Sequence, residues 1–245
     1  MKNISQTKLC LVYNWGLIGY PDSLELQRKL VEARLNDEIP DLLLLVQHPP
    51  VITMGKSGGE DNILVPLKVL AKRGISVFYT DRGGNITCHG PGQLVGYPIL
   101  NLDQKHIDLH WYLHSLEEVI IRTLAHLFIP ARRDPCKPGI WVGEEEICAI
   151  GIRVTRWATS HGFALNVNND LSHFSYINPC GVIGKKPTSI SKLLGHEVSI
   201  DNIVPDLVQH FSQIFDVNCV SNPLTHLVNT YDGEEILSLA YQKSP

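Results

Sequence analysis

Arg82-Gly-Gly-Asn-Ile-Thr-Cys-His-Gly-Pro-Gly-Gln93 carries the densest signal in the sequence. Its four glycines and one proline separate two strand-like runs, residues 75–80 and 94–102. Glycine lets a backbone approach a ligand closely and expose its N–H groups. Glycines alone would indicate a tight turn, but Arg82, His89 and Gln93 lie in the same stretch. We therefore interpret it as a ligand-binding loop between strands.

The sequence on both sides of this loop predicts a mixture of strands and helices. Helical spacing predicts a helix that begins near Asp22, a short one at 66–73, one at 109–124 and one at 204–215. Short apolar or alternating runs predict strands at 8–14, 41–47, 51–54, 75–80, 94–102, 140–142, 147–154 and 163–167. A hairpin at Gly143-Glu144 implies antiparallel pairs, so the expected class is α+β, a mixed sheet with packed helices. We expect one domain over 1–245, with a small C-terminal cap from about residue 195.

Composition narrows the class of protein. The chain has 245 residues, of which 44% are hydrophobic, and 21 Lys and Arg against 25 Asp and Glu give a net charge of −4. Disorder and a surface built for nucleic acid are thereby disfavoured. Residues 1–8 lack the apolar region of a signal peptide, and the longest apolar run, 42–46, cannot span a bilayer. We expect a cytoplasmic enzyme with free thiols, no membrane partner and no nucleic-acid partner.

Two further segments carry candidate chemistry. Ser160-His-Gly-Phe-Ala-Leu-Asn-Val167 places His161 at the mouth of a strand, where it can bind a ligand, act as a base or simply hold the backbone. Asn178-Pro-Cys-Gly181 places Cys180 among turn formers, where a thiol can be exposed. Such a thiol reacts as the thiolate, which needs a nearby base or cation, and His89 and His161 are candidates. A zinc site of Cys88, His89, His161 and Cys180 is an alternative, although its spacing fits no known zinc module.

Together these segments resemble the lipoyl(octanoyl)transferase family. The family pattern R-G-G-x-x-T-[YF]-H-G-P-G-Q corresponds to residues 82–93, and K-I-x-[AS]-[IL]-G-[IV]-[RK] corresponds to 147–153 without its lysine. The pattern H-G-[LF]-A-[LI]-N corresponds to 161–166, and P-C-G followed by T-S-[LI] corresponds to 179–181 and 188–190. The resemblance extends over about residues 10–215, including Gln47-His-Pro-Pro50 near the first strands.

This resemblance implies a fold, a reaction and a site. The fold is that of the biotin/lipoate protein ligase catalytic domain. The reaction moves an octanoyl group from octanoyl-acyl carrier protein to a lysine of an apo-lipoyl domain, as the first step of endogenous protein lipoylation. Cys180 would carry the group as a thioester, with His161 and His89 as further catalytic residues. The substrate-binding residues implied are Arg82, Gly83, Gly84, Asn85, Ile86, Thr87, Cys88, His89, Ala149, Ile150, Gly151, Gly162, Phe163 and Ala164.

One position departs from the family pattern. Glu146 stands where the family has a lysine that lowers the thiol pKa, and a carboxylate beside Cys180 would raise that pKa instead. Three explanations stay open. His89 or His161 does the proton work with Glu146 orienting it, a lysine such as Lys185 or Lys186 reaches the site, or the protein is an impaired relative that only binds acyl chains or lipoyl domains.

The resemblance also implies the partners. Acyl carrier proteins are acidic, so a basic patch is expected, with Arg132, Arg133 and Lys137, Arg153 and Arg156, or Lys185 and Lys186 as candidates. The acceptors would be the lipoyl domains of 2-oxo acid dehydrogenase E2 subunits and the glycine-cleavage H protein. No metal and no organic cofactor is implied, and we expect a monomer. An ATP-using lipoate or biotin ligase is an alternative enzyme class, but the sequence lacks the glycine-arginine adenylate loop of biotin ligases.

Overall fold

The structure, a computed structural model, describes residues 8–134, 137–184 and 186–222. Within these residues the chain forms a sheet of nine strands and a second sheet of three. The large sheet contains β1 (Lys8–Leu17), β2 (Asp41–Gln47), β6 (Gln93–Ile99), β7 (Arg132–Asp134), β8 (Lys137–Val142), β9 (Glu145–Thr155), β10 (Ala158–Asn166), β11 (Lys186–Pro187) and β12 (Val217–Ser221). The small sheet contains β3 (Val51–Met54), β4 (Ser76–Tyr79) and β5 (Ile86–His89).

The large sheet is mixed, as the sequence predicts. Its order is β12-β1-β2-β6-β10-β9-β8-β7, with β11 paired to β9. β1 runs parallel to β2 and β12, and β11 runs parallel to β9. Every other pair is antiparallel, from β2 and β6 to β7 and β8. The predicted α+β class is confirmed.

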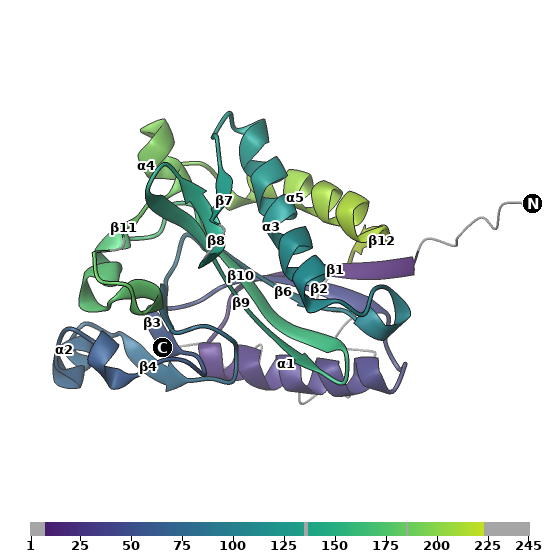
Figure 1. Cartoon of the computed structure of the whole chain (residues 1–245), viewed down its shortest axis with the longest axis horizontal. Coiled ribbons are helices and arrows are strands. Elements are labelled where there is room, and N and C mark those ends of the chain that lie inside the picture. Colours follow the sequence, from purple (N-terminus) through teal and green to yellow (C-terminus); the bar gives the residue numbers. More distant parts are fainter. Residues whose placement is uncertain (1–7, 135–136, 185, 223–245) are drawn as a thin grey trace, which may run out of the picture.

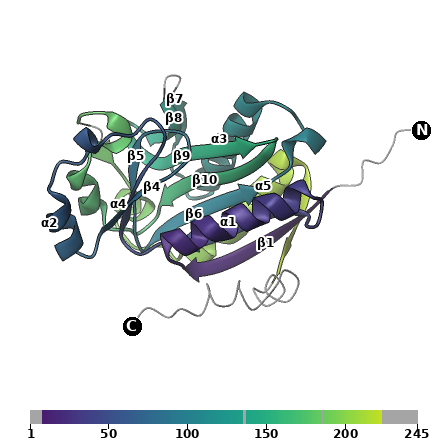
Figure 2. The ribbon, with the colours of Figure 1, turned by 90° about the horizontal axis from the view of Figure 1, so that it is seen from below.

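Helices cover both faces of the large sheet (Figures 1 and 2). α1 packs on one face, α3 and α5 pack on the other, and α2 lies beside the small sheet. The helices are α1 (Tyr20–Leu35), α2 (Leu67–Lys72), α3 (Leu109–His126), α4 (Ile190–Leu194) and α5 (Ile200–Phe215). Short 3₁₀ turns complete the described part: η1 (Glu60–Asn62), η2 (Leu102–Gln104), η3 (Leu171–Tyr176) and η4 (Pro179–Gly181).

The hydrophobic pattern explains this layering. The apolar run of β2 has both of its faces buried, because helices cover the sheet from both sides. α3 begins at the N-cap Asp108, whose carboxylate accepts the backbone N–H groups of His110 and Trp111. Its apolar stripe joins α5 and one sheet face in a single cluster, whereas α1 and the other face form a second.

Several boundaries differ from the sequence-based expectation. β10 begins at Ala158, five residues before the expected start at 163, so His161 lies within the strand and not at its mouth. α1 begins at Tyr20, with Gly19 as its N-cap, so Asp22 lies in the first turn instead of capping the helix. The glycine-rich loop contains a short strand, β5, because its apolar residues pair with β3. α5 begins four residues before Val204 and contains Pro205 inside the helix, where proline has no N–H to donate to the carbonyl four residues earlier.

The segment expected as a C-terminal cap is described up to residue 222. Its helix α5 packs against α3 in the main core, and β12 extends the large sheet beside β1. Residues 223–245 lie outside the described residues. In the part of the chain that the structure describes, no helix is both long and apolar enough to cross a membrane.

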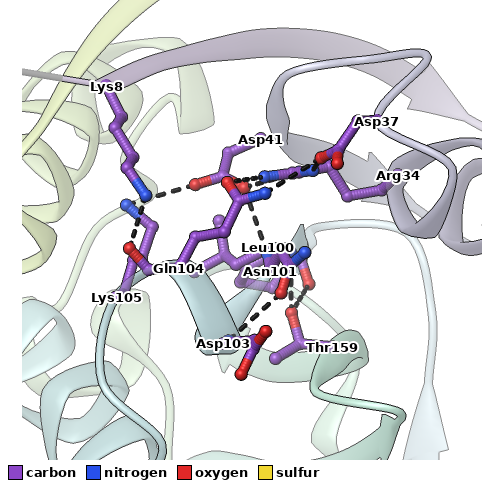
Figure 3. A network of polar contacts seen from close by, with 11 residues as sticks. Lys8, Arg34, Asp37, Asp41, Leu100, Asn101, Asp103, Gln104, Lys105 and Thr159 are labelled. Carbon is purple, nitrogen blue, oxygen red and sulfur yellow. Dashed lines mark hydrogen bonds and ion pairs between the residues drawn. The ribbon is translucent and has the colours of Figure 1, made fainter.

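A buried ionic network joins α1, β2 and η2 (Figure 3). Asp41, at the start of β2, is 2% exposed and accepts the Nε–H of Arg34 at 2.9 Å and the backbone N–H of Asn101 at 3.1 Å. Lys105 Nζ lies 3.1 Å from the other carboxylate oxygen. Arg34 also donates to Asp37 at 2.7 Å. These contacts fix the end of α1 against the sheet.

Candidate functional site

The glycine-rich loop connects the two sheets. Residues 86–89 form β5 of the small sheet, and Gln93 begins β6 of the large one. Gly92, between them, has a φ of 85°, and a Cβ there would lie 2.9 Å from the backbone of residues 168–169. Glycine is therefore required at this turn, which brings the loop against the end of β10.

A cleft lies beside this loop and collects most of the predicted site residues. Three predicted residues are absent from its lining: Gly83, Cys88 and Glu146. The Gly83 N–H donates to the Ile152 carbonyl, Cys88 is packed in the apolar core of the small sheet, and Glu146 is described below. Three lining residues were not predicted: Tyr20, Val95 and Tyr97. The predicted residues that line the cleft are Arg82, Gly84, Asn85, Ile86, Thr87, His89, Ala149, Ile150, Gly151, His161, Gly162, Phe163, Ala164 and Cys180.

Small residues of β9 and β10 form part of the cleft wall. Gly151 pairs with Gly162, and Ala149 pairs with Ala164. A Cβ at Gly162 would lie 2.2 Å from the carbonyl oxygen of Gly96, so no larger residue fits there. Short side chains leave room for a ligand to lie along the strands, and the apolar walls suit an alkyl chain.

Cys180 lies on the left-handed turn η4. Its φ and ψ are 56° and 18°, a region that a non-glycine residue occupies only when the surrounding structure enforces it. Asn62 holds the turn through its backbone carbonyl, which accepts the N–H of Asn178 at 2.8 Å. A Cβ at Gly181 would lie 2.6 Å from Nδ2 of Asn85. The turn is therefore seated on the glycine-rich loop, with the half-buried Cys180 facing the cleft.

A chain of hydrogen bonds fixes the protonation of His89. Gln93 donates through Nε2 to Asn166 at 2.9 Å, so its Oε1 accepts the Nδ1–H of His89 at 2.7 Å. The other ring nitrogen, Nε2, then accepts the hydroxyl of Thr53 at 3.2 Å. Burial lowers the pKa of His89 to about 3, so the ring is neutral. Both ring nitrogens have partners within the protein, which gives His89 a structural position.

Arg82 brings a buried positive charge into the cleft. Its Nη2 donates to the carbonyl and the hydroxyl of Thr53, at 2.7 and 3.0 Å. Burial lowers its pKa, and a Cys180 thiolate would favour the charged form of the guanidinium. The attraction is reciprocal, so Arg82 favours the thiolate of Cys180.

His161 has a carboxylate partner, and that partner is Asp81. Nε2–H of His161 donates to Oδ1 of Asp81 at 2.9 Å, and Arg153 forms an ion pair with the other carboxylate oxygen. Burial, followed by the charges of Arg82 and Arg153, lowers the pKa of His161 to about 3. The neutral ring therefore keeps Nδ1 as an acceptor. Sequence reasoning missed Asp81, which lies 80 residues before its partner.

Glu146 lies on β9 but is not part of the cleft lining. It is 4% exposed, its carbonyl accepts the backbone N–H of Thr188 at 2.9 Å, and its Oε1 lies 2.9 Å from where a Cβ on Gly139 would be. After burial, the Glu146 charge is the largest cause that raises the pKa of the Cys148 thiol. The Glu146 carboxylate therefore disfavours ionisation of the Cys148 thiol.

Of the two candidate lysines, Lys186 lies within the described residues, on β11. Lys186 pairs with Glu145 in the β11–β9 register, and its charge helps to lower the pKa of that carboxyl. Lys185 lies outside the described residues. Among residues 8–134, 137–184 and 186–222, no group of three or more His, Cys, Asp or Glu side chains is placed to hold a metal ion.

Comparison with solved structures defines the class of fold. A bipartite lipoate protein ligase from Thermoplasma acidophilum, studied with its E2 lipoyl domain, superposes with a TM-score of 0.71 and 18% identity. The match covers 96% of this chain and 91% of that one. The fold is therefore that of the lipoate protein ligase catalytic domain, as the sequence resemblance implies.

Sequence comparison places the chain more closely. An octanoyltransferase of Solibacter usitatus is 46% identical over 84% of this chain and 93% of its own length. One of Caldicellulosiruptor saccharolyticus is 43% identical over 93% of this chain and 95% of its own. The lipoyl protein ligase A/B catalytic domain matches residues 19–212. The chain belongs to this family, and it is an enzyme of the acyltransferase class.

Proposed function

We propose that the enzyme transfers an octanoyl group from octanoyl-acyl carrier protein to a lysine of an apo-lipoyl domain, through a thioester on Cys180. The observation that carries the proposal is the seating of Cys180 in a left-handed turn at a cleft with small residues along β9 and β10. The alkyl chain would lie along these strands. We infer that the acyl group is octanoyl because relatives at 43–46% identity are named octanoyltransferases.

The proposed reaction has two balanced steps. The Cys180 thiolate attacks the thioester carbonyl of the donor, the bond to the carrier sulfur breaks, and the carrier leaves as a thiolate that takes up a proton. The lysine amine of the acceptor then attacks the new thioester, an amide forms, and Cys180 is released as a thiolate while the amine loses its proton. Exchange between thioesters is nearly balanced and formation of the amide is downhill, so the reaction needs no ATP.

Electrostatics of the cleft support the thiolate. Arg82 supplies the buried cation that favours ionisation of Cys180. Neutral His161, oriented by Asp81, offers Nδ1 as an acceptor for the proton of the incoming amine. This division of roles accounts for activity with Glu146 at the family's lysine position. The competing explanation, in which Lys185 or Lys186 accepts the proton in place of His161, is tested below.

The proposed acceptors are lipoyl domains of 2-oxo acid dehydrogenase E2 subunits and the glycine-cleavage H protein. The T. acidophilum ligase of the same fold has an E2 lipoyl domain as its partner. We propose that the acidic carrier protein approaches the basic residues Arg153 and Arg156 at the end of the β9–β10 hairpin, and that the enzyme acts as a monomer.

Intact mass spectrometry after mixing with octanoyl-acyl carrier protein, without ATP, tests the proposal. The wild type should gain one octanoyl group that hydroxylamine removes, and Cys180→Ser should gain no thioester. Once acylated, Lys185→Ala and Lys186→Ala should pass the octanoyl group to an apo-lipoyl domain at the wild-type rate if His161 accepts the proton of the amine. No adduct at any pH would overturn the transferase and favour a relative that only binds acyl chains or lipoyl domains.

A further inference from the structure

A second cleft adjoins the first at His161. It lies between one face of α1 and the β9–β10 hairpin, on the side of His161 where Asp81 binds the ring. His161 lines both clefts. The polar lining of the second cleft consists mainly of Gln27, Arg28, Asp81, Arg153, Ser160 and His161.

Gln27 lines this cleft and carries a buried donor. The side chain is 1% exposed, and its Oε1 accepts the backbone N–H of His161 at 2.8 Å. The amide nitrogen is therefore the remaining end, and it has no hydrogen-bond partner within the described residues. A buried amide without an acceptor costs about 1–3 kcal/mol, so a ligand oxygen at this place would be bound favourably.

The charges of the cleft favour an anion. Arg28 and Arg153 contribute two positive charges, and Asp81 contributes one negative charge. Arg153 and His161 occupy both oxygens of that carboxylate, and His161 is neutral. The guanidinium of Arg28 is largely exposed and has a long contact, 3.7 Å, to Glu25 one helical turn away. Over the residues that line the cleft the balance is one positive charge, and the Glu25 carboxylate that pairs with Arg28 lies outside the lining.

We propose that this second cleft binds the phosphate-bearing, amide-containing arm of the acyl thioester donor. The inference rests on the proposed function. The arm that coenzyme A and carrier proteins share joins a thioester through amides to a phosphate. With the acyl chain in the first cleft, the arm extends past His161, an amide oxygen accepts Nε2–H of Gln27, and the phosphate pairs with Arg28. Arg28 and Gln27 are then specificity determinants for the donor.

Single-turnover acylation with three donors tests this site. Octanoyl-carrier protein and octanoyl-coenzyme A carry the phosphate, whereas octanoyl-N-acetylcysteamine lacks it. Arg28→Ala should raise the half-saturating concentration of both phosphate donors roughly tenfold, with an unchanged maximal rate and no effect on the third donor. Arg122→Ala is the matched control, because Arg122 is also an exposed helical arginine with a partner in its own helix, and α3 lies on the opposite face of the sheet.

The outcomes separate the alternatives. If Arg28→Ala weakens binding of the carrier-protein donor alone, Arg28 contacts the surface of the carrier protein. If the substitution affects all three donors equally, or none of them, the arm binds elsewhere. Either result overturns the inference. Titration of the free enzyme with coenzyme A by calorimetry gives a readout that is independent of acylation. The wild type should bind it, Arg28→Ala should bind roughly tenfold more weakly, and equal binding by both would overturn the arm site even if the transferase is correct.

Discussion

Three buried neutral histidines should make the enzyme sensitive to mild acid. Burial lowers the pKa of His48 to about 4 and those of His89 and His161 to about 3. In the unfolded chain each ring titrates near pH 6.5. Below that pH the unfolded state binds more protons than the folded state, so the free energy of unfolding falls as the pH falls. Between pH 7 and pH 5 each ring should lower the free energy of unfolding by about 2 kcal/mol, and the three together by about 5–6 kcal/mol.

This magnitude depends only on folded pKa values that lie well below 5. Urea unfolding at pH 7, 6 and 5, followed by circular dichroism, measures it. His48→Asn gives the comparison, because an asparagine Nδ2–H can still donate to the Ile18 carbonyl that accepts Nδ1–H of His48 at 2.8 Å. The variant loses the bond from the Tyr97 hydroxyl and is less stable at pH 7, by about 1–3 kcal/mol.

The decisive quantity is the pH dependence of the variant. Between pH 7 and pH 5 the free energy of unfolding of the variant should fall by about 2 kcal/mol less than that of the wild type, because one titrating group is gone. Identical pH dependence in both proteins would show that His48 titrates in the folded state and would refute the reasoning.

Three further substitutions test separate parts of the structure. Asp81→Asn should lower the maximal rate of transfer at least tenfold with unchanged folding, because His161 loses its orienting carboxylate; an unchanged pH–rate profile would contradict this role. Gly96→Ala should destabilise by about 1–3 kcal/mol, because its Cβ would lie 2.1 Å from the ring of Phe163, and a thermal melt with no shift would show that the ring moves freely. Asp41→Asn should cost about 3–5 kcal/mol by urea unfolding, because two buried cations lose their counter-charge; a loss below 1 kcal/mol would count against the network.

Local pattern predicted the long elements and the main motifs. The apolar run of β2 and the stripe of α3 are strong periodic signals, and both were placed nearly to the residue. β5, β7, β11 and β12 are short, and residues such as Ile86–His89 lie among turn formers, so pairing with a distant strand decides their conformation. Tertiary contact overrides propensity in such segments.

The sequence predicted the motifs that make up the candidate site, but it did not predict the contacts between their residues. Asp81 meets His161 across 80 residues, and Gln27 meets the same residue across 134. No spacing rule encodes such a distance, because the packing of α1 and of the loop after β4 against β10 brings the partners together. Glu146 was expected beside Cys180 on the family pattern, but it lies outside the lining of the cleft that Cys180 faces.

The left-handed backbone conformation of Cys180 lowers the stability of the fold, whereas its side chain is needed for the proposed activity. A non-glycine residue in this conformation costs about 1–2 kcal/mol relative to glycine. Replacement by glycine would therefore strengthen the fold while removing the thiol proposed to carry the acyl group. Random mutagenesis selected only for heat resistance should enrich replacements at this codon, whereas selection that also demands transfer should retain the cysteine and collect stabilising changes elsewhere.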